Sequence, residues 1–208
     1  MGFRVSLASA VLAVTCRAAS SGVTTGECRD QIAPAILIRV TGVKLPALAE
    51  AHAKVVAEKI LRPAGINLRW STSEFPADLR RCASLVVLLE VGGRVPAGSD
   101  DAWGFASPYA SSGSRIHVFW ERIESGSQEE LWGHLLGHVF AHEITHILEG
   151  VARHSNEGLM KPHWSLADLY AMAYRPLPLT AEDIDLIHLG LAALREKATA
   201  DSGPIAGH

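Results

Sequence analysis

The segment from Ser127 to Gly150 constrains the fold of this chain more than any other part of the sequence. Ser127 and Glu130 have the spacing of a Ser-x-x-Glu capping box, which favours the start of a helix. Gly150 stands where a glycine commonly ends a helix, so we predict one long helix over about residues 128–149. Small residues recur along it at every fourth position, which should let another backbone, expected to be the sheet, approach closely: Gly133, Gly137, Ala141 and Thr145.

The rest of the chain has the patterns of strands interspersed with helices. Apolar or alternating runs predict strands over residues 35–40, 66–70, 84–91 and 115–120, with a short edge strand over 103–106. The run over 84–91 is continuously apolar, which favours burial on both faces. A helix is expected from Pro46 to about residue 62, and Thr180 caps a final helix. This order predicts an α/β domain, with a mixed, twisted sheet of about five strands backed by two long helices and a helical C-terminal part.

Length and composition limit the classes of protein to consider. The chain has 208 residues, which suits a single domain. Hydrophobic residues make up 48% and charged residues 20%, a composition that excludes an intrinsically disordered chain. The net charge of −3 provides no basic excess to neutralise phosphates, so we expect no nucleic-acid partner. No apolar run is long enough to span a bilayer, so we expect no membrane span.

The amino terminus has the pattern of a secretory signal peptide. Arg4 precedes a short apolar run, and small residues follow from Ala18 to Gly22. We therefore expect residues 1–19 to be a signal peptide and residues 20–208 to form a single exported domain, secreted or periplasmic. A lipid anchor at Cys16 fits less well, because Thr15 stands where a small glycine or alanine is expected.

The number of cysteines is consistent with export. Cleavage of the signal peptide would remove Cys16 and leave Cys28 and Cys82. An even number of cysteines in an exported protein suggests a disulfide between them.

Histidines concentrate in the second half of the chain, where six of the ten lie between His134 and His163. Within that region, His142, Glu143 and His146 form the pattern His-Glu-x-x-His. Residues four apart lie on one face of a helix, about 6 Å apart along its axis, so the two imidazoles can bind one Zn²⁺. Glu143 can then act as general base on water without itself binding the metal.

A catalytic zinc site needs a third protein ligand and an open fourth position. Gly150 ends the helix, so the chain can turn back, and His154 follows four residues later. We therefore predict His154 as the third ligand. Glu157 and His163 remain alternatives, whereas Glu149 lies on the helix itself, before any reversal of the chain.

These residues resemble the metzincin clan of zinc endopeptidases, whose pattern His-Glu-x-x-His-x-x-Gly-x-x-His is followed by a methionine turn. The resemblance covers roughly residues 35–164, implies a zincin-like fold, and is closest to small exported bacterial members. The spacing departs from the clan's pattern, because two extra residues lie in the ligand loop. The matching positions, in order, are His142, Glu143, His146, Gly150, His154 and Met160.

Two further assignments concern residues after the methionine turn, and the first is an alternative to the metzincin pattern. A gluzincin-type enzyme takes an acidic third ligand from a later helix, where Glu182 or Asp183 could serve. Some metzincins use a tyrosine after the methionine turn to stabilise the oxyanion. Tyr170 and Tyr174 have that place, although packing is the simpler role for each.

Several weaker features have simple structural explanations. His134 and His138 continue the four-residue spacing, and we expect them to be partly exposed or hydrogen-bonded rather than metal ligands. Asp100 and Asp101 are expected to be solvated rather than to bind calcium. Residues 103–106 could align a peptide through main-chain hydrogen bonds.

Together these patterns predict a zinc-dependent peptidase, an endopeptidase by its resemblance, that binds one catalytic Zn²⁺ and acts on peptides or proteins. Two alternatives are a zinc-stabilised domain without catalysis and an exported adhesin or scaffold without metal. The carboxylate of Glu143 favours the enzyme, because a purely structural zinc site does not need it.

Overall fold

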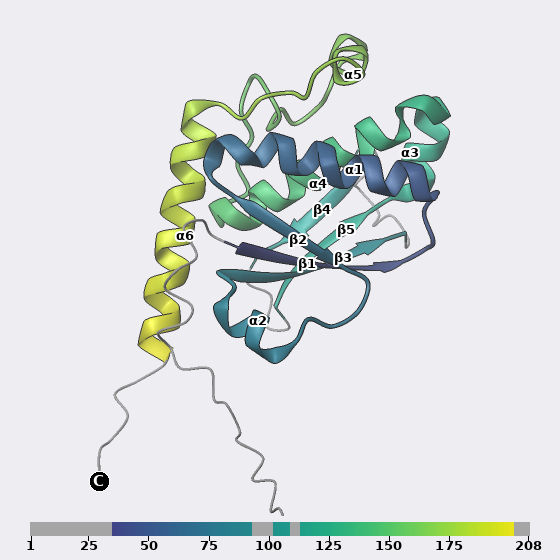
Figure 1. Ribbon diagram of the computed structural model, residues 1–208. Coiled ribbons are helices and arrows are strands. Elements are labelled where there is room, and N and C mark those ends of the chain that lie inside the picture. Colours follow the sequence, from purple (N-terminus) through teal and green to yellow (C-terminus); the bar gives the residue numbers. More distant parts are fainter. Residues whose placement is uncertain (1–34, 93–101, 109–112, 202–208) are drawn as a thin grey trace, which may run out of the picture.

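A five-stranded sheet with the order β2-β1-β3-β5-β4 forms the centre of the molecule (Figure 1). The structure is a computed structural model that describes residues 35–92, 102–108 and 113–201. The expected signal peptide, Cys16, Cys28, Asp100 and Asp101 lie outside these residues. The strands are β1 (Ala35–Gly42), β2 (Asn67–Ser71), β3 (Leu85–Val91), β4 (Gly104–Ser107) and β5 (Ser114–Val118).

Parallel pairing joins all neighbouring strands except β4, which runs antiparallel to β5 at one edge. Each predicted strand is present within a few residues of its expected bounds, and the mixed sheet confirms the predicted α/β class. Residues 119–120 do not extend the last strand, because helix α3 (Trp120–Gly126) begins there.

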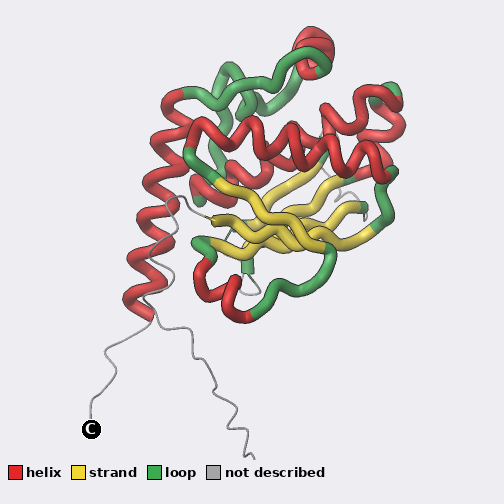
Figure 2. Tube along the Cα trace, in the orientation of Figure 1, coloured by secondary structure: helices red, strands yellow, loops and turns green. Residues whose placement is uncertain are grey.

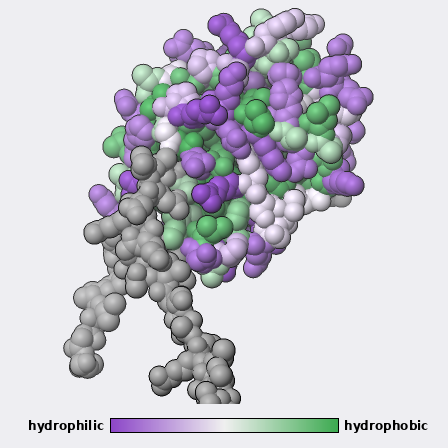
Figure 3. All heavy atoms as spheres, viewed as in Figure 1, coloured by the Kyte–Doolittle hydropathy of each residue, from purple (hydrophilic) through white to green (hydrophobic). Residues whose placement is uncertain are grey.

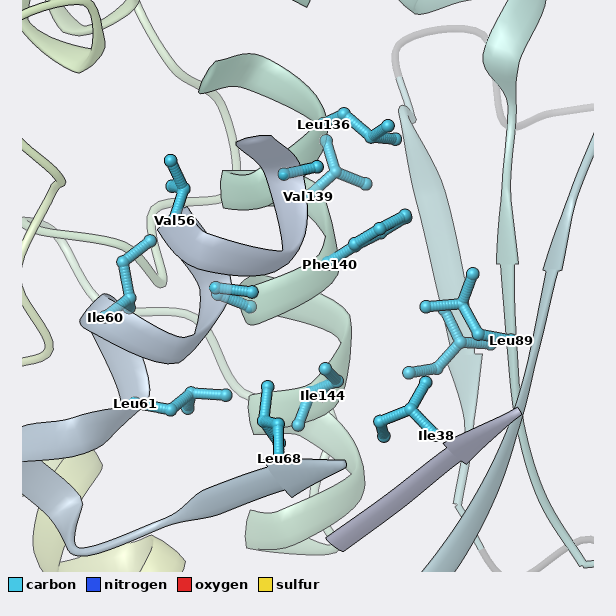
Figure 4. Close-up of a cluster of buried hydrophobic side chains, with 14 of the residues drawn as sticks. Ile38, Val56, Ile60, Leu61, Leu68, Leu89, Leu136, Val139, Phe140 and Ile144 are labelled. Atoms are coloured by element: carbon cyan, nitrogen blue, oxygen red, sulfur yellow. The ribbon is translucent and has the colours of Figure 1, made fainter. Parts of the chain in front are cut away.

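Two long helices, α1 (Ala47–Leu61) and α4 (Trp132–Glu149), cover one face of the sheet (Figure 2). The core lies between these helices and the strands. Figure 4 shows side chains of α4, such as Phe140 and Ile144, directed toward Ile38 of β1 and Leu89 of β3. All four of these side chains are fully buried.

The remaining helices are short or lie beside this core. They are η1 (Arg62–Ala64), α2 (Ala77–Cys82), η2 (Glu129–Leu131), α5 (Leu166–Met172) and α6 (Ala181–Asp201). Thr180 caps α6 as predicted, since its hydroxyl accepts a hydrogen bond from the amide of Asp183. Neither α2 nor the capping box that begins α5, formed by Ser165 and Asp168, was predicted from the sequence.

The predicted capping box at the start of the long helix is wrong. Helix α4 begins at Trp132, after the short turn η2, and no side chain caps it. Ser127 instead ends α3, where its hydroxyl donates to the carbonyl of Ile123. The helix end is as predicted, because Gly150 has a φ of 70° and its amide donates to the carbonyl of His146.

The line of small residues on α4 faces α1 and not the sheet. A Cβ atom at Gly137 would lie 2.7 Å from the backbone oxygen of Ala53, and one at Gly133 would lie 2.8 Å from the Cβ of His52. The small residues therefore let the two helices cross closely, while bulkier side chains of α4, such as Phe140, are directed toward the sheet.

Strand β3 is also less buried than predicted. Val87, Leu89 and Val91 are buried against the helices, whereas Val86 is 39% exposed on the other face. Continuous apolar sequence did not distinguish full burial from one-sided burial.

Over the surface visible in Figure 3, polar and apolar residues are interspersed. No helix among the described residues is long and apolar enough to cross a membrane.

Candidate metal centre

Helix α4 places His142 and His146 on one face, as the four-residue spacing requires. Their Nε2 atoms lie 3.1 Å apart, and each residue is only 9% exposed. Two imidazole nitrogens at this distance are aimed at nearly the same point, which is the arrangement that a shared ion needs.

The loop after α4 brings His154 to the same point. Gly150 turns the chain out of the helix, and the His154 ring lies 5.4 Å from that of His142 and 4.9 Å from that of His146 between centroids. One nitrogen from each of the three rings lies within 4.8 Å of the other two. The two extra residues in this loop therefore do not keep His154 away from the pair.

The backbone carbonyl of Leu159 orients the first histidine. Nδ1 of His142 donates to the carbonyl of Leu159 at 3.0 Å, which leaves Nε2 with a free lone pair. The indole of Trp164 donates to the same carbonyl at 3.1 Å and contacts the His142 ring edge-on. Leu159 and the following Met160 are fully buried, so this carbonyl belongs to a rigid part of the core.

Burial keeps the two helix histidines neutral. Loss of solvation, and then the neighbouring His146, lowers the pKa of His142 to about 3. Loss of solvation, and then the neighbouring His154, lowers the pKa of His146 to about 4. Nδ1 of His146 is buried beside the backbone of Val151 without a hydrogen bond of normal geometry. Neutral imidazoles are the form that binds a metal, so this donor set fits a divalent ion such as zinc.

Glu143 lies beside the three histidines, against the edge strand β4. It is 6% exposed, and its burial raises the pKa of the carboxyl to about 8. Glycine at position 104 makes room for it, since a Cβ atom there would lie 3.3 Å from Oε1 of Glu143 and 2.7 Å from the backbone oxygen of His117. The carboxyl can therefore hold and release a proton close to the histidine cluster.

A cleft of about 600 Å³ opens over these groups. The edge strand β4 forms one wall, and residues after the ligand loop form another. Aromatic side chains from both walls line it: Trp103, Phe105 and Trp164. The one lysine in the lining, Lys161, is held by the carboxylate of Asp168 at 2.5 Å, so the walls present mostly apolar surface.

Of the candidates for the third ligand, the fold brings His154 to the two helix histidines. In the described part of the chain, the histidines at positions 142, 146 and 154 are the one cluster with metal-ligating geometry. His163 lines the same cleft without joining that cluster, and Glu157 is exposed outside it. Glu149 is buried at the end of α4 but points to Arg153 instead of the histidines.

The two acidic residues suggested for a gluzincin-type site are also engaged elsewhere. Asp183 is fully buried and bonded to Arg153 and to the amide of Thr180. Glu182 is exposed, with its carboxylate 3.5 Å from the same arginine. Neither residue lies in the histidine cluster, so the structure does not supply an acidic third ligand from α6.

The tyrosines and the upstream histidines lie away from the cleft. Tyr170 is 66% exposed and Tyr174 is 90% exposed, so neither packs in the core and neither lines the cleft. His138 is buried and hydrogen-bonded as predicted, and His134 contacts His52 of α1 edge-on.

Sequence reasoning missed Gly104, Trp164 and Arg153 as residues that support the site. Gly104 is far from the histidine motif in sequence, and Trp164 follows Met160 closely, but no spacing rule connects either residue with the motif. Arg153 precedes His154 directly, but its partner on α6 lies 30 residues further along the chain.

No protein-family model matches the sequence, and the search of curated proteins gives no match. Among solved structures, the chain is similar to the crystal structure of an archaemetzincin from Methanopyrus kandleri. The TM-score is 0.50 with 14% sequence identity, and the match covers 77% of this chain and 96% of the archaemetzincin. At this identity the likeness is one of fold, so this chain has the α/β fold of an archaemetzincin.

Proposed function

We propose that this protein is a zinc-dependent peptidase of the metzincin type. The observation that carries the proposal is the convergence of three imidazoles within 4.8 Å beside the buried carboxyl of Glu143. The fold likeness to an archaemetzincin, whose name places it with the metzincin clan, supports the same family. Both agree with the resemblance in the motif from His142 to Met160.

The donor set favours a catalytic ion over a structural one. Structural zinc sites in proteins have four protein ligands, whereas catalytic sites have three and keep one position open. Among the described residues, the cluster contains three histidines and no fourth ligand. His142, His146 and His154 would hold one Zn²⁺ at the floor of the cleft.

Each group at this site has a separate role in peptide hydrolysis. Zinc, when bound, supplies a Lewis acid that lowers the pKa of water to about 7 and polarises a carbonyl. Glu143 accepts the proton of the attacking water and then donates it to the leaving amine. The carbonyl of Leu159 holds the His142 ring in place throughout, because it fixes the proton on Nδ1.

The substrate is proposed to be an extended peptide or protein segment. Strand β4 has β5 on one side only and lies at the end of the sheet, so its other edge can pair with a peptide backbone. Such pairing extends along the chain on both sides of the scissile bond, which supports an endopeptidase. The aromatic walls of the cleft favour apolar side chains next to that bond.

The test is to compare the purified wild-type chain with Glu143→Gln for metal content and for cleavage of a fluorescence-quenched peptide library. Wild type should contain one zinc per chain and cleave peptides. The variant should keep the zinc and lose cleavage by at least about 100-fold, because the general base is gone while the ligands remain. Unchanged cleavage by the variant would refute the proposal, and zinc without cleavage in wild type would favour a non-catalytic domain.

We also propose that residues 1–19 are removed during export and that residues 20–208 form one exported domain. Cys82 is disulfide-bonded, which supports an oxidising compartment, and we propose Cys28 as its partner. Mass spectrometry of the protein from the periplasm or medium should find a start near residue 20 and a peptide that links Cys28 to Cys82. Retention of the intact chain in the cytoplasm with both thiols free would contradict this proposal.

A further inference from the structure

The loop that carries His154 is fixed on both sides of this residue. On one side, the amide of Ser155 donates to the carbonyl of Met160 at 2.8 Å, and its hydroxyl donates to the carbonyl of Glu157 at 2.7 Å. On the other side, Arg153 reaches across to helix α6. The two contacts of Ser155 are local in sequence. Arg153, in contrast, connects the loop to a distant part of the chain.

The contact between Arg153 and α6 is a partly buried ion pair. Nη2 of Arg153 lies 2.5 Å from Oδ1 of Asp183, with side-chain exposures of 26% and 0%. The other oxygen of Asp183 accepts the amide of Thr180 at 2.8 Å, so this carboxylate cannot turn away from the loop without breaking the helix cap. A pair with one fully buried and immobilised partner holds its geometry far better than an exposed pair.

Helix α6 is in turn held against the end of α4, the helix that carries the other two histidines. A Cβ atom at Gly190 would lie 1.9 Å from the backbone oxygen of Leu148, so the two backbones are in direct contact there. Glu149, in the last turn of α4, is fully buried without a hydrogen-bond partner and lies 4.0 Å from Nη2 of Arg153. Arg153 therefore lies next to one carboxylate from α4 and one from α6, and the positions of these two helices determine where its guanidinium lies.

We propose that Arg153 is a positioning residue, which holds the imidazole of His154 at the point shared by His142 and His146. The proposal rests on the proposed zinc site. The ligand loop is two residues longer than in the metzincin pattern, and a longer loop loses more conformational entropy when it is fixed in one position. An ion pair on the residue next to the ligand restricts that freedom before any metal binds.

The experiment measures Zn²⁺ affinity of Arg153→Met by competition with a chromogenic chelator. We expect affinity to fall about 10–100-fold, the usual loss when a residue that supports a metal ligand is removed. Cobalt in place of zinc should show weaker visible absorption in the variant, because a site with two fixed histidines takes up more water than a tetrahedral site. Arg39→Met is the control, since it removes an arginine from an ion pair with Glu74, and neither residue lines the cleft.

A double variant separates positioning from general stability. If Arg153 acts through His154, then Arg153→Met should cost no further zinc affinity once His154→Ala is present. Equal losses with and without His154, or no loss in the wild-type background, would overturn the proposal. Should Arg153→Met fail to fold, Asp183→Asn replaces it, because asparagine can still accept the Thr180 amide while it loses the charge that faces Arg153.

These measurements do not depend on hydrolysis. If wild type binds zinc but cleaves no peptide, the proposed peptidase function fails while the zinc affinities still decide the role of Arg153. If wild type binds no zinc, both proposals are wrong. If wild type is an active zinc enzyme and Arg153→Met retains its zinc affinity and cobalt spectrum, only the role of Arg153 is refuted.

Discussion

Acidification should destabilise the folded chain through His138, a buried residue outside the proposed metal centre. Its Nδ1 bonds to the carbonyl of His134 at 2.7 Å, and its Nε2 accepts the amide of Leu177 at 3.0 Å. Both contacts are satisfied by the neutral ring with its proton on Nδ1. A second proton would have to be placed on Nε2, where it would face the Leu177 amide.

The pKa of His138 sets the size of this effect. Burial, as the largest cause, lowers it from 6.5 to about 4. Well above pH 6.5 the ring is neutral in both states and its contribution to stability is complete. As the pH falls from there, the unfolded chain binds a proton that the folded chain does not, so stability is lost. The loss is about 2 kcal/mol at pH 5 and about 3 kcal/mol at pH 4.

The assay is urea unfolding of the metal-free protein, in the presence of a chelator, at several pH values between 7.5 and 4. Wild type is compared with His138→Gln, whose side chain is polar but does not titrate. Other histidines titrate equally in both proteins, so the difference between the two curves isolates position 138. The free energy of unfolding of wild type should fall more steeply by the amounts given above. Parallel curves for the two proteins would refute the reasoning.

Three further predictions concern the site and its support. Gly104→Ala should reduce peptide cleavage at least about 10-fold with zinc retained, because the new methyl group would lie 2.7 Å from the backbone oxygen of His117, which shifts strand β4, and would also crowd the proposed base Glu143. Unchanged turnover would contradict this. His154→Ala should weaken zinc binding strongly in a chelator competition, whereas His163→Ala should not, and the reverse result would transfer the ligand role to His163. Gly137→Leu should lower the free energy of unfolding, measured by urea titration, by about 3 kcal/mol or more, since α1 leaves no room for a side chain there. A change within about 0.5 kcal/mol would instead show that the two helices can move apart.

The elements that sequence reasoning predicted best are those governed by local geometry. The strand at β1 and the helix at α1 follow from apolar periodicity, and Gly150 ends α4 because a left-handed backbone suits glycine. The capping box at Ser127 was wrong because the same residue can equally cap the end of the preceding helix, and local pattern does not distinguish the two.

Features that depend on neighbours were harder to predict. The small residues at Gly133 and Gly137 indicated a close approach, but their partner was α1 and not the sheet. Tyr170 and Tyr174 were expected to pack, yet Tyr170 in α5 and Tyr174 just after it are both exposed. In each case the residue type indicated what was possible, and the arrangement of distant elements decided what occurred.

The sequence by itself determined the pair His142 and His146 and the adjacent Glu143, because the pitch of a helix fixes the relative positions of residues one turn apart. Only the tertiary structure decided that His154, and not His163 or Glu157, completes the cluster. That choice depends on a loop whose path is set by contacts with α6 and with the segment around Met160. The sheet order in turn places β4 beside Glu143, and neither arrangement follows from local spacing.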